Sequence, residues 1–277
     1  MKNYKLILQY DGTRYSGWQK QGNTDNTIQF KLETIAEKLT GIPTDVNGSG
    51  RTDAGVHALG QVANFRCDES CLRFLQPHSP SAHIAKSVSP SCSATMTDTE
   101  YILRYFNNAL PMDIRVLQVD QMPARFHSRL NAKEKHYRYV IDNQTVPNVF
   151  ERRYAARIPA EHENRIEYDI TEMNKAAAYL IGTHDFKSFC DNRHMKKSTV
   201  RTIRDILIEN NNNRITLDFY GNGFLYHMVR ILTGTLLEVG SGKKVSSDIP
   251  RILQALDRRE AGFTAPAAGL FLVEVTY

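Results

Sequence analysis

The sequence predicts an α+β protein, because strand-like and helix-like segments are mixed without the regular strand–helix alternation of parallel α/β folds. Strands are indicated by apolar residues at every second position, as between Tyr4 and Tyr10. Helices are indicated by apolar residues three or four positions apart, as at Ile28, Leu32 and Ile35. The chain has 277 residues, 41% of them hydrophobic and 23% charged, so it is long enough for one large or two small cores.

The first half of the chain is expected to contain three strands and two helices. Asn26 with Gln29 is typical of a helix start, and Gly41 of a helix end. The Gly-rich segment around Asp53 precedes a strand, and Pro111 stops the second helix. In chain order, we expect a strand at 4–10, a helix at 28–39, a strand near 61–65, a helix at 101–110 and a strand at 114–119.

The second half shows a similar mixture of elements. Asp169 with Glu172 is typical of a capped helix start, and the Asn-rich run 210–213 of a turn between two strands. In chain order, we expect a strand at 137–141, a helix from 170 to 180, strands at 200–209 and 214–220, a helix at 228–239 and a closing strand at 271–277.

Residues 67–98 are rich in Ser and Pro, which predicts a loop or a poorly ordered insertion. Three of the four cysteines lie in or near it, and no Cys or His pair follows at the spacing of a zinc site. We therefore expect free thiols and no metal. The chain has no run of about 18 apolar residues, so no membrane span is expected, and its first residues do not resemble a signal peptide.

The net charge of +5 and the sequence pI of about 8.9 are compatible with a nucleic-acid partner without establishing one. Two stretches, 125–138 and 193–204, combine several Lys and Arg residues, and the first interleaves them with aromatic residues. Such side chains can neutralise phosphates and stack on unpaired bases. Solvated polar strand faces explain the same pattern.

Residues 48–60 place a carboxylate, Asp53, two positions after a guanidinium, Arg51, and Gly48, Gly50 and Gly55 flank this pair. Glycine permits tight backbone paths and close approach of a ligand to the main chain. A neighbouring cation can keep such an acid ionised and oriented. A tight turn that carries a surface ion pair is the other interpretation of this local pattern.

The chain resembles the tRNA pseudouridine synthase A family through a series of motifs in the family's order. Residues 50–58 are similar to the family's active-site motif, and the segment 67–98 is longer than the family pattern leads us to expect. The other matching segments are 10–19, 27–33, 108–114, 126–129, 135–139, 186–189, 200–203, 223–230 and 264–270. They cover nearly the whole chain, which makes the resemblance specific.

The resemblance implies two ferredoxin-like halves that share one long antiparallel sheet, with a central active-site cleft. Residues 1–124 would form the half that carries Asp53, with an insertion at about 67–98, and residues 125–277 the other half. It further implies a cytoplasmic homodimer that isomerises uridine to pseudouridine in the tRNA anticodon stem-loop, at positions 38, 39 and 40. An isomerisation needs no redox cofactor, nucleotide or metal, so none is expected.

Three residues are the catalytic candidates. Asp53 is the expected catalytic acid residue, acting as a nucleophile, as a stabiliser of charge at C1′ or as a base toward the sugar. Arg230 is its expected ion-pair partner. Tyr137 resembles the family's active-site tyrosine, whose ring can stack on uracil and whose hydroxyl can help remove the C5 proton. Tyr139 has the same facing on the strand and is the alternative.

Five residues are the candidate RNA contacts. Arg51 matches a position that the family associates with opening the stem and holding a flipped nucleotide, which a guanidinium can brace by stacking. Tyr137 is expected to contact the target base. Arg125, Arg129 and Arg138 belong to the basic stretch that is expected to meet phosphates. Trp18, the only tryptophan, is expected to pack beneath the active-site loop.

Two alternatives to this function stay open at the level of sequence. The first is a related synthase that modifies another tRNA position or ribosomal RNA, which the long segment 67–98 motivates. The second is a non-catalytic RNA-binding protein, against which the combination of Asp53, Arg51, Tyr137 and Arg230 argues, since a binding module needs no such acid.

Overall fold

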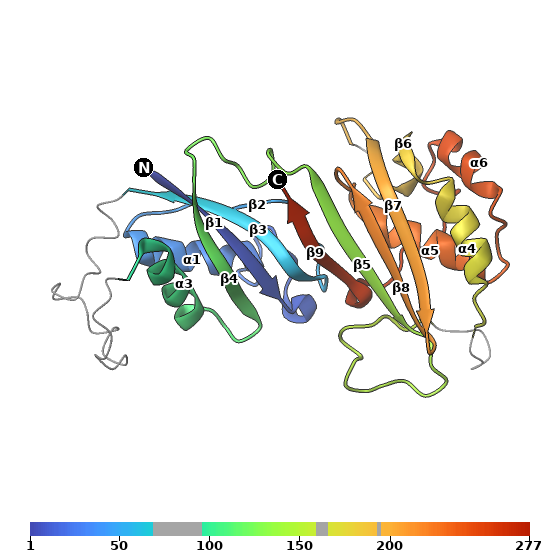
Figure 1. Cartoon of the computed structure of the whole chain (residues 1–277), viewed down its shortest axis with the longest axis horizontal. Coiled ribbons are helices and arrows are strands. Elements are labelled where there is room, and N and C mark those ends of the chain that lie inside the picture. Colours follow the sequence, from blue (N-terminus) through green and yellow to red (C-terminus); the bar gives the residue numbers. More distant parts are fainter. Residues whose placement is uncertain (69–95, 159–165, 193–194) are drawn as a thin grey trace. The chain divides into compact units, whose positions relative to one another are not determined.

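The computed structural model describes residues 1–68, 96–158, 166–192 and 195–277 (Figure 1). Most of the expected insertion therefore lies outside the described residues, and so do Cys71 and Cys92. The chain forms two compact units. The first contains residues 1–52 and 60–131, and the second contains residues 53–59 and 132–277. Seven residues around the Asp53 turn thus belong to the second unit, although both flanking segments belong to the first.

The first unit has the element order βαββαβ. Its strands are hydrogen-bonded in the order β4-β1-β3-β2, and the β1–β4 and β2–β3 pairs are antiparallel. The elements are β1 (Lys2–Tyr10), the 3₁₀ turn η1 (Gly12–Arg14), α1 (Ile28–Thr40), β2 (Asn47–Gly48), β3 (His57–Cys67), α3 (Asp98–Ala109) and β4 (Ile114–Met122).

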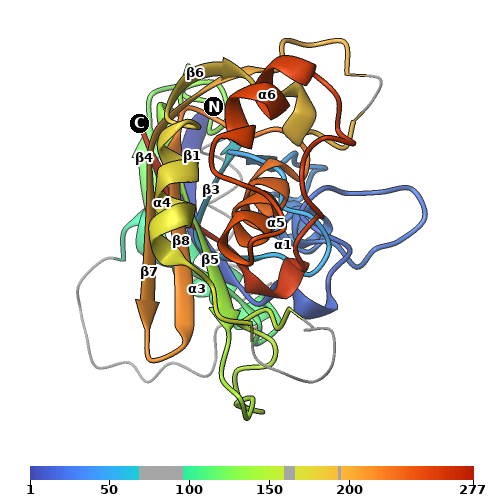
Figure 2. The same ribbon diagram turned by 90° about the vertical axis from the view of Figure 1, so that its right-hand side faces the viewer.

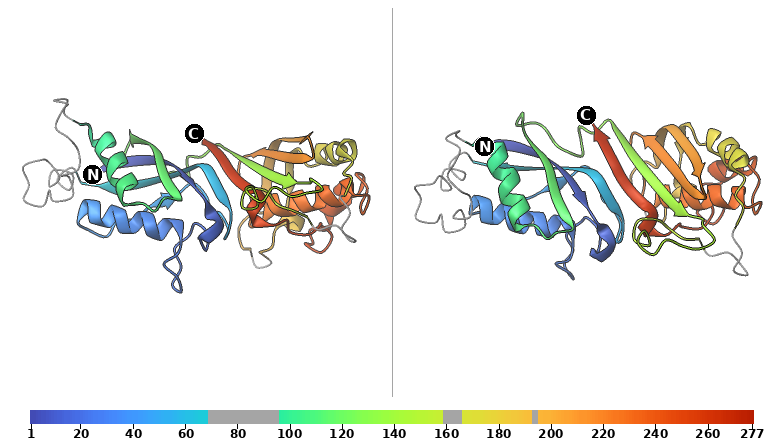
Figure 3. Two further views of the ribbon diagram at one scale, coloured as in Figure 1. Left: turned by 90° about the horizontal axis from the view of Figure 1, so that it is seen from below. Right: turned by 60° about the horizontal axis from the view of Figure 1, so that its bottom comes forward.

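Helices α1 and α3 pack side by side along this sheet (Figure 3). Their apolar faces and the inward-facing residues of β1 form the core, because burying these surfaces is what stabilises each amphipathic element. Fully buried members of this core include Tyr4, Leu6, Leu8, Leu32, Ile102 and Phe106.

The second unit repeats this arrangement with additional elements. Its strands are ordered β9-β5-β8-β7-β6, and all these neighbours are antiparallel. The elements are β5 (Glu134–Asp142), α4 (Ile170–Ala178), β6 (Gly182–Asp185), η4 (Lys187–Phe189), β7 (Val200–Asn211), β8 (Arg214–Gly221), α5 (Met228–Gly240), α6 (Asp248–Ala255), η5 (Ala267–Gly269) and β9 (Leu270–Thr276).

Helices α4 and α5 pack together against one face of this second sheet (Figure 2). The core between these helices and the sheet includes fully buried residues of β8 and α5. They are Leu217 and Phe219 of β8 and Ile231, Leu232 and Leu236 of α5. The first residues of β3 also belong here, because His57 and Ala58 pair in parallel with Phe271 and Leu272 of β9. The described chain is thus a mixed α/β protein whose strands pair mostly antiparallel.

The capping residues correct one sequence prediction and confirm another. Thr27, not Asn26, caps α1, because the Thr27 hydroxyl accepts from the Phe30 N–H. The Asn26 amide instead donates to the Arg14 carbonyl at the end of η1. Asp169 caps α4 as expected by accepting from the Glu172 N–H at 3.0 Å. Both residues satisfy backbone donors that a helix start leaves open.

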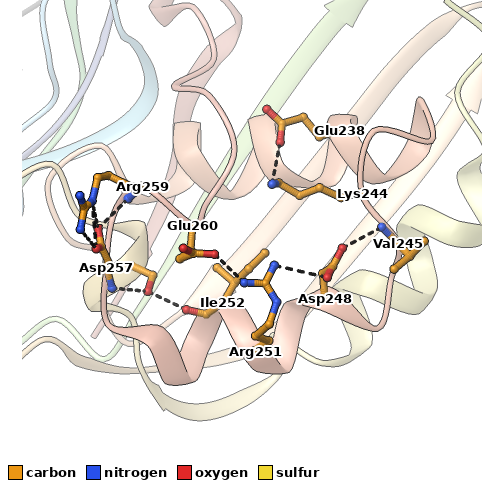
Figure 4. Close-up of polar contacts among 10 residues, drawn as sticks. Glu238, Lys244, Val245, Asp248, Arg251, Ile252, Asp257, Arg259 and Glu260 are labelled. Atoms are coloured by element: carbon orange, nitrogen blue, oxygen red, sulfur yellow. Dashed lines mark hydrogen bonds and ion pairs between the residues drawn. The ribbon is translucent and has the colours of Figure 1, made fainter.

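Helix α6 is joined to the loop after it by a network of polar contacts (Figure 4). Arg251 bonds to Asp248 at 3.4 Å and to Glu260 at 2.5 Å. The Ser188 hydroxyl donates to the Ile252 carbonyl at 2.6 Å and accepts from the Asp257 N–H at 3.0 Å. These bonds hold residues 257–260, which lead directly into the segment 261–267 beside the site described next.

No helix within the described ranges is long and apolar enough to cross a bilayer. Cys67 and Cys190 are both buried.

Candidate active site

Asp53 lies in a tight turn that leads into β3. The Val56 N–H donates to the Asp53 carbonyl at 3.1 Å and closes the turn. Gly55 has φ +79°, a backbone conformation that side chains other than glycine rarely adopt, and a Cβ there would lie 3.3 Å from the Ala267 Cβ. The glycine in the motif therefore serves both the turn and its packing against Ala267.

The Asp53 carboxylate meets the N-terminus of α5. Oδ2 of Asp53 is 3.5 Å from Nη1 of Arg230 and 3.5 Å from Nε2 of His227. Arg230 lies in the first turn of α5 and His227 is its N-cap, so the carboxylate also faces the positive end of the helix dipole. The side chains of Asp53, Arg230 and His227 are 22%, 15% and 18% exposed, so all three are largely buried and each keeps some exposed surface.

Arg230 is fixed by the backbone of the segment beside α5. Its Nε donates to the Ala265 carbonyl at 2.7 Å, and the Ala265 N–H donates back to the Arg230 carbonyl at 3.1 Å. The helix and this segment approach closely, since a Cβ on Gly234 would lie 1.9 Å from the Phe263 carbonyl oxygen. The guanidinium is thus anchored at one end and presents its other end to Asp53.

His227 is held by a second carboxylate that sequence reasoning did not single out. Nδ1 of His227 is 2.6 Å from Oδ2 of Asp191. Arg258 donates through Nε to Oδ1 of Asp191 at 2.7 Å, and the Thr264 hydroxyl donates to Oδ2 at 3.2 Å. Burial raises the pKa of Asp191, but the hydrogen bonds from His227 and Arg258 outweigh it and leave this pKa below its ordinary value.

Four consecutive residues, 264–267, each contact a different part of the site. This segment matches one of the motifs identified in the sequence, and its contacts give that motif a structural reason. The contacts are Thr264 with Asp191, the Ala265 carbonyl with Arg230, the Pro266 carbonyl with Tyr139, and Ala267 with the Gly55 turn.

The two candidate tyrosines on β5 differ in what their side chains do. The Tyr139 hydroxyl donates to the Pro266 carbonyl at 2.7 Å, and burial raises the pKa of this hydroxyl well above its usual range. The Tyr137 ring makes an edge-to-face contact with Phe224, at 5.2 Å between ring centres. Tyr139 is therefore bonded to the segment that supports Arg230, whereas the Tyr137 ring packs against Phe224.

The candidate RNA contacts divide between the two units. Arg51, Arg125 and Arg129 belong to the first unit, are exposed, and form no ion pair with any described residue. Exposed guanidiniums of this kind are suited to phosphate contact. Asp53, Tyr137, Arg138 and Arg230 belong to the second unit.

Arg138 differs from the other basic candidates because its charge is offset. Its Nε and Nη2 donate to the two oxygens of Asp218 at 2.9 and 3.1 Å. His136 bonds to the same carboxylate through Nε2. The hydrogen bond to Asp218 raises the pKa of Arg138 and, with His136, lowers the pKa of Asp218 against its burial. The pair leaves Arg138 with less net charge toward a phosphate.

Trp18 packs against the backbone that precedes Asp53, as expected. It is 3% exposed, and a Cβ on Gly48 would lie 2.4 Å from its indole ring. The Trp18 N–H also donates to the Thr52 carbonyl at 3.0 Å. The glycine at position 48 is therefore required by close packing.

The sequence carried one signal for the residues that it missed. His227 stands three positions before Arg230, a spacing that puts both on one side of a helix start. Asp191 and Arg258 gave no such signal, because each is far in sequence from its partner. Asp191 lies 36 residues before His227, and Arg258 lies 67 residues after Asp191. Among the described residues, no cluster of three or more His, Cys, Asp or Glu side chains has the geometry to hold a metal ion.

Comparison with known proteins identifies the family. A family model described as tRNA pseudouridine synthase matches residues 6–129 and 176–277. The chain is 43% identical to tRNA pseudouridine synthase A of Bacillus sp. (strain KSM-64), 41% identical to that of Acetivibrio thermocellus and 39% identical to tRNA pseudouridine synthase A 2 of Bacillus anthracis. Each of these alignments covers all of both chains.

These matches agree with the motifs and with the geometry around Asp53, and they set aside the non-catalytic alternative. The chain therefore belongs to the tRNA pseudouridine synthase family and is an isomerase that converts uridine to pseudouridine in tRNA.

Proposed function

We propose that this enzyme modifies uridines 38, 39 and 40 of the tRNA anticodon stem-loop and that Asp53 is its catalytic carboxylate. The observation that carries the role of Asp53 is its placement, half-buried in a rigid turn at the N-terminus of α5 beside Arg230 and His227. A carboxylate held this way is oriented before substrate arrives, which is how electrostatic catalysis avoids reorganisation at the reacting centre.

The reaction conserves every atom of the substrate. The N1–C1′ glycosidic bond breaks, the uracil turns, a C5–C1′ bond forms, C5 loses its proton and N1 ends with one. Asp53 acts at the sugar during bond cleavage, as a nucleophile at C1′, as a stabiliser of positive charge there or as a base toward the sugar. Tyr137 stacks on the uracil and its hydroxyl assists removal of the C5 proton. Arg230 orients the Asp53 carboxylate.

The arginines provide the RNA-binding part of this proposal. Arg51 braces the stem and the flipped nucleotide, while Arg125, Arg129 and Arg138 contact phosphates. Positions 38, 39 and 40 follow one another along the anticodon stem-loop, and an enzyme that reads RNA shape and backbone can reach more than one of them.

We further propose the domain organisation that the resemblance implies, with ferredoxin-like halves at 1–124 and 125–277 that share one sheet and enclose the active-site cleft. The strand orders support the ferredoxin-like character of each half. In the first unit the order is β4-β1-β3-β2. In the second, β9-β5-β8-β7 gives the same pattern with β6 added at the edge.

We also propose that the enzyme works as a homodimer in the cytoplasm. The support is the family resemblance together with the substrate, because tRNA is a cytoplasmic molecule in bacteria. Light scattering coupled to size-exclusion chromatography tests the dimer directly, since a 31.5 kDa chain would elute with twice that mass.

The decisive experiment is tritium release from C5-labelled uridine in unmodified tRNA that carries uridines at 38, 39 and 40. Wild type is expected to release tritium, and Asp53→Asn, which is nearly isosteric and lacks the carboxylate, is expected to bind the tRNA without release. Mapping pseudouridine in cells that lack the protein then tests the positions. Loss at another tRNA position or in ribosomal RNA would replace the anticodon assignment with the alternative target.

A further inference from the structure

His227 lies between two carboxylates that belong to different parts of the chain. Its Nδ1 is 2.6 Å from Oδ2 of Asp191 and its Nε2 is 3.5 Å from Oδ2 of Asp53. Two arginines complete the arrangement, since Arg230 contacts Asp53 and Arg258 bonds to Asp191. The Tyr226 ring stacks on the imidazole at 3.8 Å between ring centres. These are the charged and titratable groups that the described structure places around the imidazole.

The position of His227 is fixed by its backbone as well as by these partners. Its φ is +61°, in the left-handed region that residues other than glycine rarely adopt. Non-glycine residues in that region are strained, and strain of this kind persists only where the surroundings hold it and is often functional. The residue turns the chain directly into α5, and the contacts of its ring with Asp191 and Asp53 hold the imidazole beside the start of that helix.

The hydrogen bonds determine which ring nitrogen can titrate. An ionised carboxylate can only accept, so Nδ1 must carry a proton while Asp191 is ionised. Arg258 and Thr264 keep Asp191 in that state. The charged and neutral forms of the imidazole then differ only in the proton on Nε2. When present, it faces the Asp53 carboxylate as a charged donor, and when absent, a lone pair faces the same carboxylate.

We propose that His227 is a positioning residue for Asp53, oriented by Asp191, and that the proton on its Nε2 holds the Asp53 carboxylate aimed at the sugar. Both His227 and Arg230 approach Oδ2 of Asp53, so neither donor occupies Oδ1. Oδ1 is the oxygen left to act on the substrate. Asp191 orients the His227 imidazole, in the way that a buried aspartate fixes the tautomer of a catalytic histidine. The inference rests on the proposed role of Asp53.

Two substitutions of His227 separate its two contacts. Asn is among the residues best tolerated at positive φ, and the Nδ2 of His227→Asn can replace the bond from Nδ1 to Asp191 while nothing reaches Asp53. In His227→Gln, the longer amide can reach Asp53 while the bond to Asp191 is lost. Asp53→Asn serves as the inactive reference, because its failure to lose activity would overturn the proposed function and not only this inference.

The experiment measures single-turnover tritium release and tRNA affinity across a pH range for wild type and these variants. We expect His227→Asn to lower the release rate by about 10- to 100-fold at low pH, as a small misplacement of a catalytic group does, with tRNA affinity unchanged. We expect the wild-type rate to fall as the pH rises and the imidazolium loses its proton. In His227→Asn this fall should be absent, so the two curves converge at high pH.

We expect His227→Gln to recover part of the rate without recovering the pH dependence, since an amide donates to Asp53 but does not titrate. Three results would overturn the inference. They are a wild-type rate for His227→Asn at every pH, an unchanged pH profile in that variant, or a loss of rate matched by an equal loss of tRNA affinity and of thermal stability. The last would mean that His227 only shapes the fold.

Discussion

Replacing the helix residue Gly234 by alanine should displace Arg230 in the candidate active site. A Cβ at this position would lie 1.9 Å from the Phe263 carbonyl oxygen and 2.9 Å from its carbonyl carbon. To restore an ordinary contact of 3.4 Å, α5 and the segment 261–267 must separate by about 1.5 Å. That movement exceeds what the 2.7 Å bond between Arg230 and the Ala265 carbonyl can absorb.

The expected effects follow from packing and geometry. Alanine favours a helix over glycine by about 1 kcal/mol, but overpacking of a rigid core costs about 1–3 kcal/mol. The free energy of unfolding should therefore change little or fall by up to about 2 kcal/mol. Whether or not stability falls, Arg230 loses its hydrogen bond to the Ala265 carbonyl. A displacement of about 1 Å near a reacting centre lowers the rate by about 10²-fold.

A matched control lies on the same helix. A Cβ at Gly240 would meet the flexible Met173 side chain, with Sδ at 2.7 Å, and Met can adapt its rotamer. We expect Gly240→Ala to retain the rate of tritium release, while Gly234→Ala loses it even where urea unfolding shows a folded protein. Wild-type activity in Gly234→Ala would refute the argument that the segment 261–267 positions Arg230.

Tyr137→Phe should lower the rate of single-turnover tritium release while leaving thermal stability within about 1 kcal/mol of wild type. Tyr139→Phe should lower stability by about 1 kcal/mol, because its hydrogen bond to the Pro266 carbonyl is lost. The reverse pattern in thermal melting and tritium release would exchange the roles of the two tyrosines. Gly55→Ala should slow release, because the turn before β3 requires positive φ, and circular dichroism with single-turnover rates checks that the fold survives. Asp191 has a depressed pKa, so its stabilisation is present above the ordinary value of 3.8 and lost as the pH falls through the folded pKa; the stability gap between wild type and Asp191→Asn should therefore shrink below about pH 4 in urea titrations.

Much of the fold could be predicted from periodicity and capping residues. The expected strand at 4–10 and helix at 28–39 correspond to β1 and α1, and the strands on either side of the Asn-rich turn correspond to β7 and β8. Asn212 and Asn213 both have positive φ, as such hairpin turns require. The sequence favours Asn26 over Thr27 as the cap of α1, because both adjacent residues are competent caps and only the tertiary contact of Asn26 decides between them.

Short elements could not be predicted. Strand β2 has two residues and β6 has four, too few for an alternation to be distinct from chance. Helix α6 has eight residues with a proline in its first turn, and it depends on bonds to Glu260 and Ser188 that lie outside its own sequence.

The candidate site was predictable where a motif existed and hidden where it did not. Asp53 and Arg230 lie 177 positions apart, and only the family resemblance paired them before the structure placed them together. Asp191 stands in no motif identified in the sequence, and an isolated aspartate after a short aromatic run predicts nothing. Its importance comes from three donors that the fold brings to it from residues 227, 258 and 264.

The path of β3 limits how this protein can be divided. Residues 53–59 are built into the second unit while the chain on both sides of them belongs to the first. A fragment made of residues 132–277 would therefore lack the Asp53 carboxylate, the turn that packs on Ala267 and the strand that pairs with Phe271. Neither half can be exchanged between relatives as an independent module, and a split protein would regain its site only if the first fragment donated this seven-residue segment to the second.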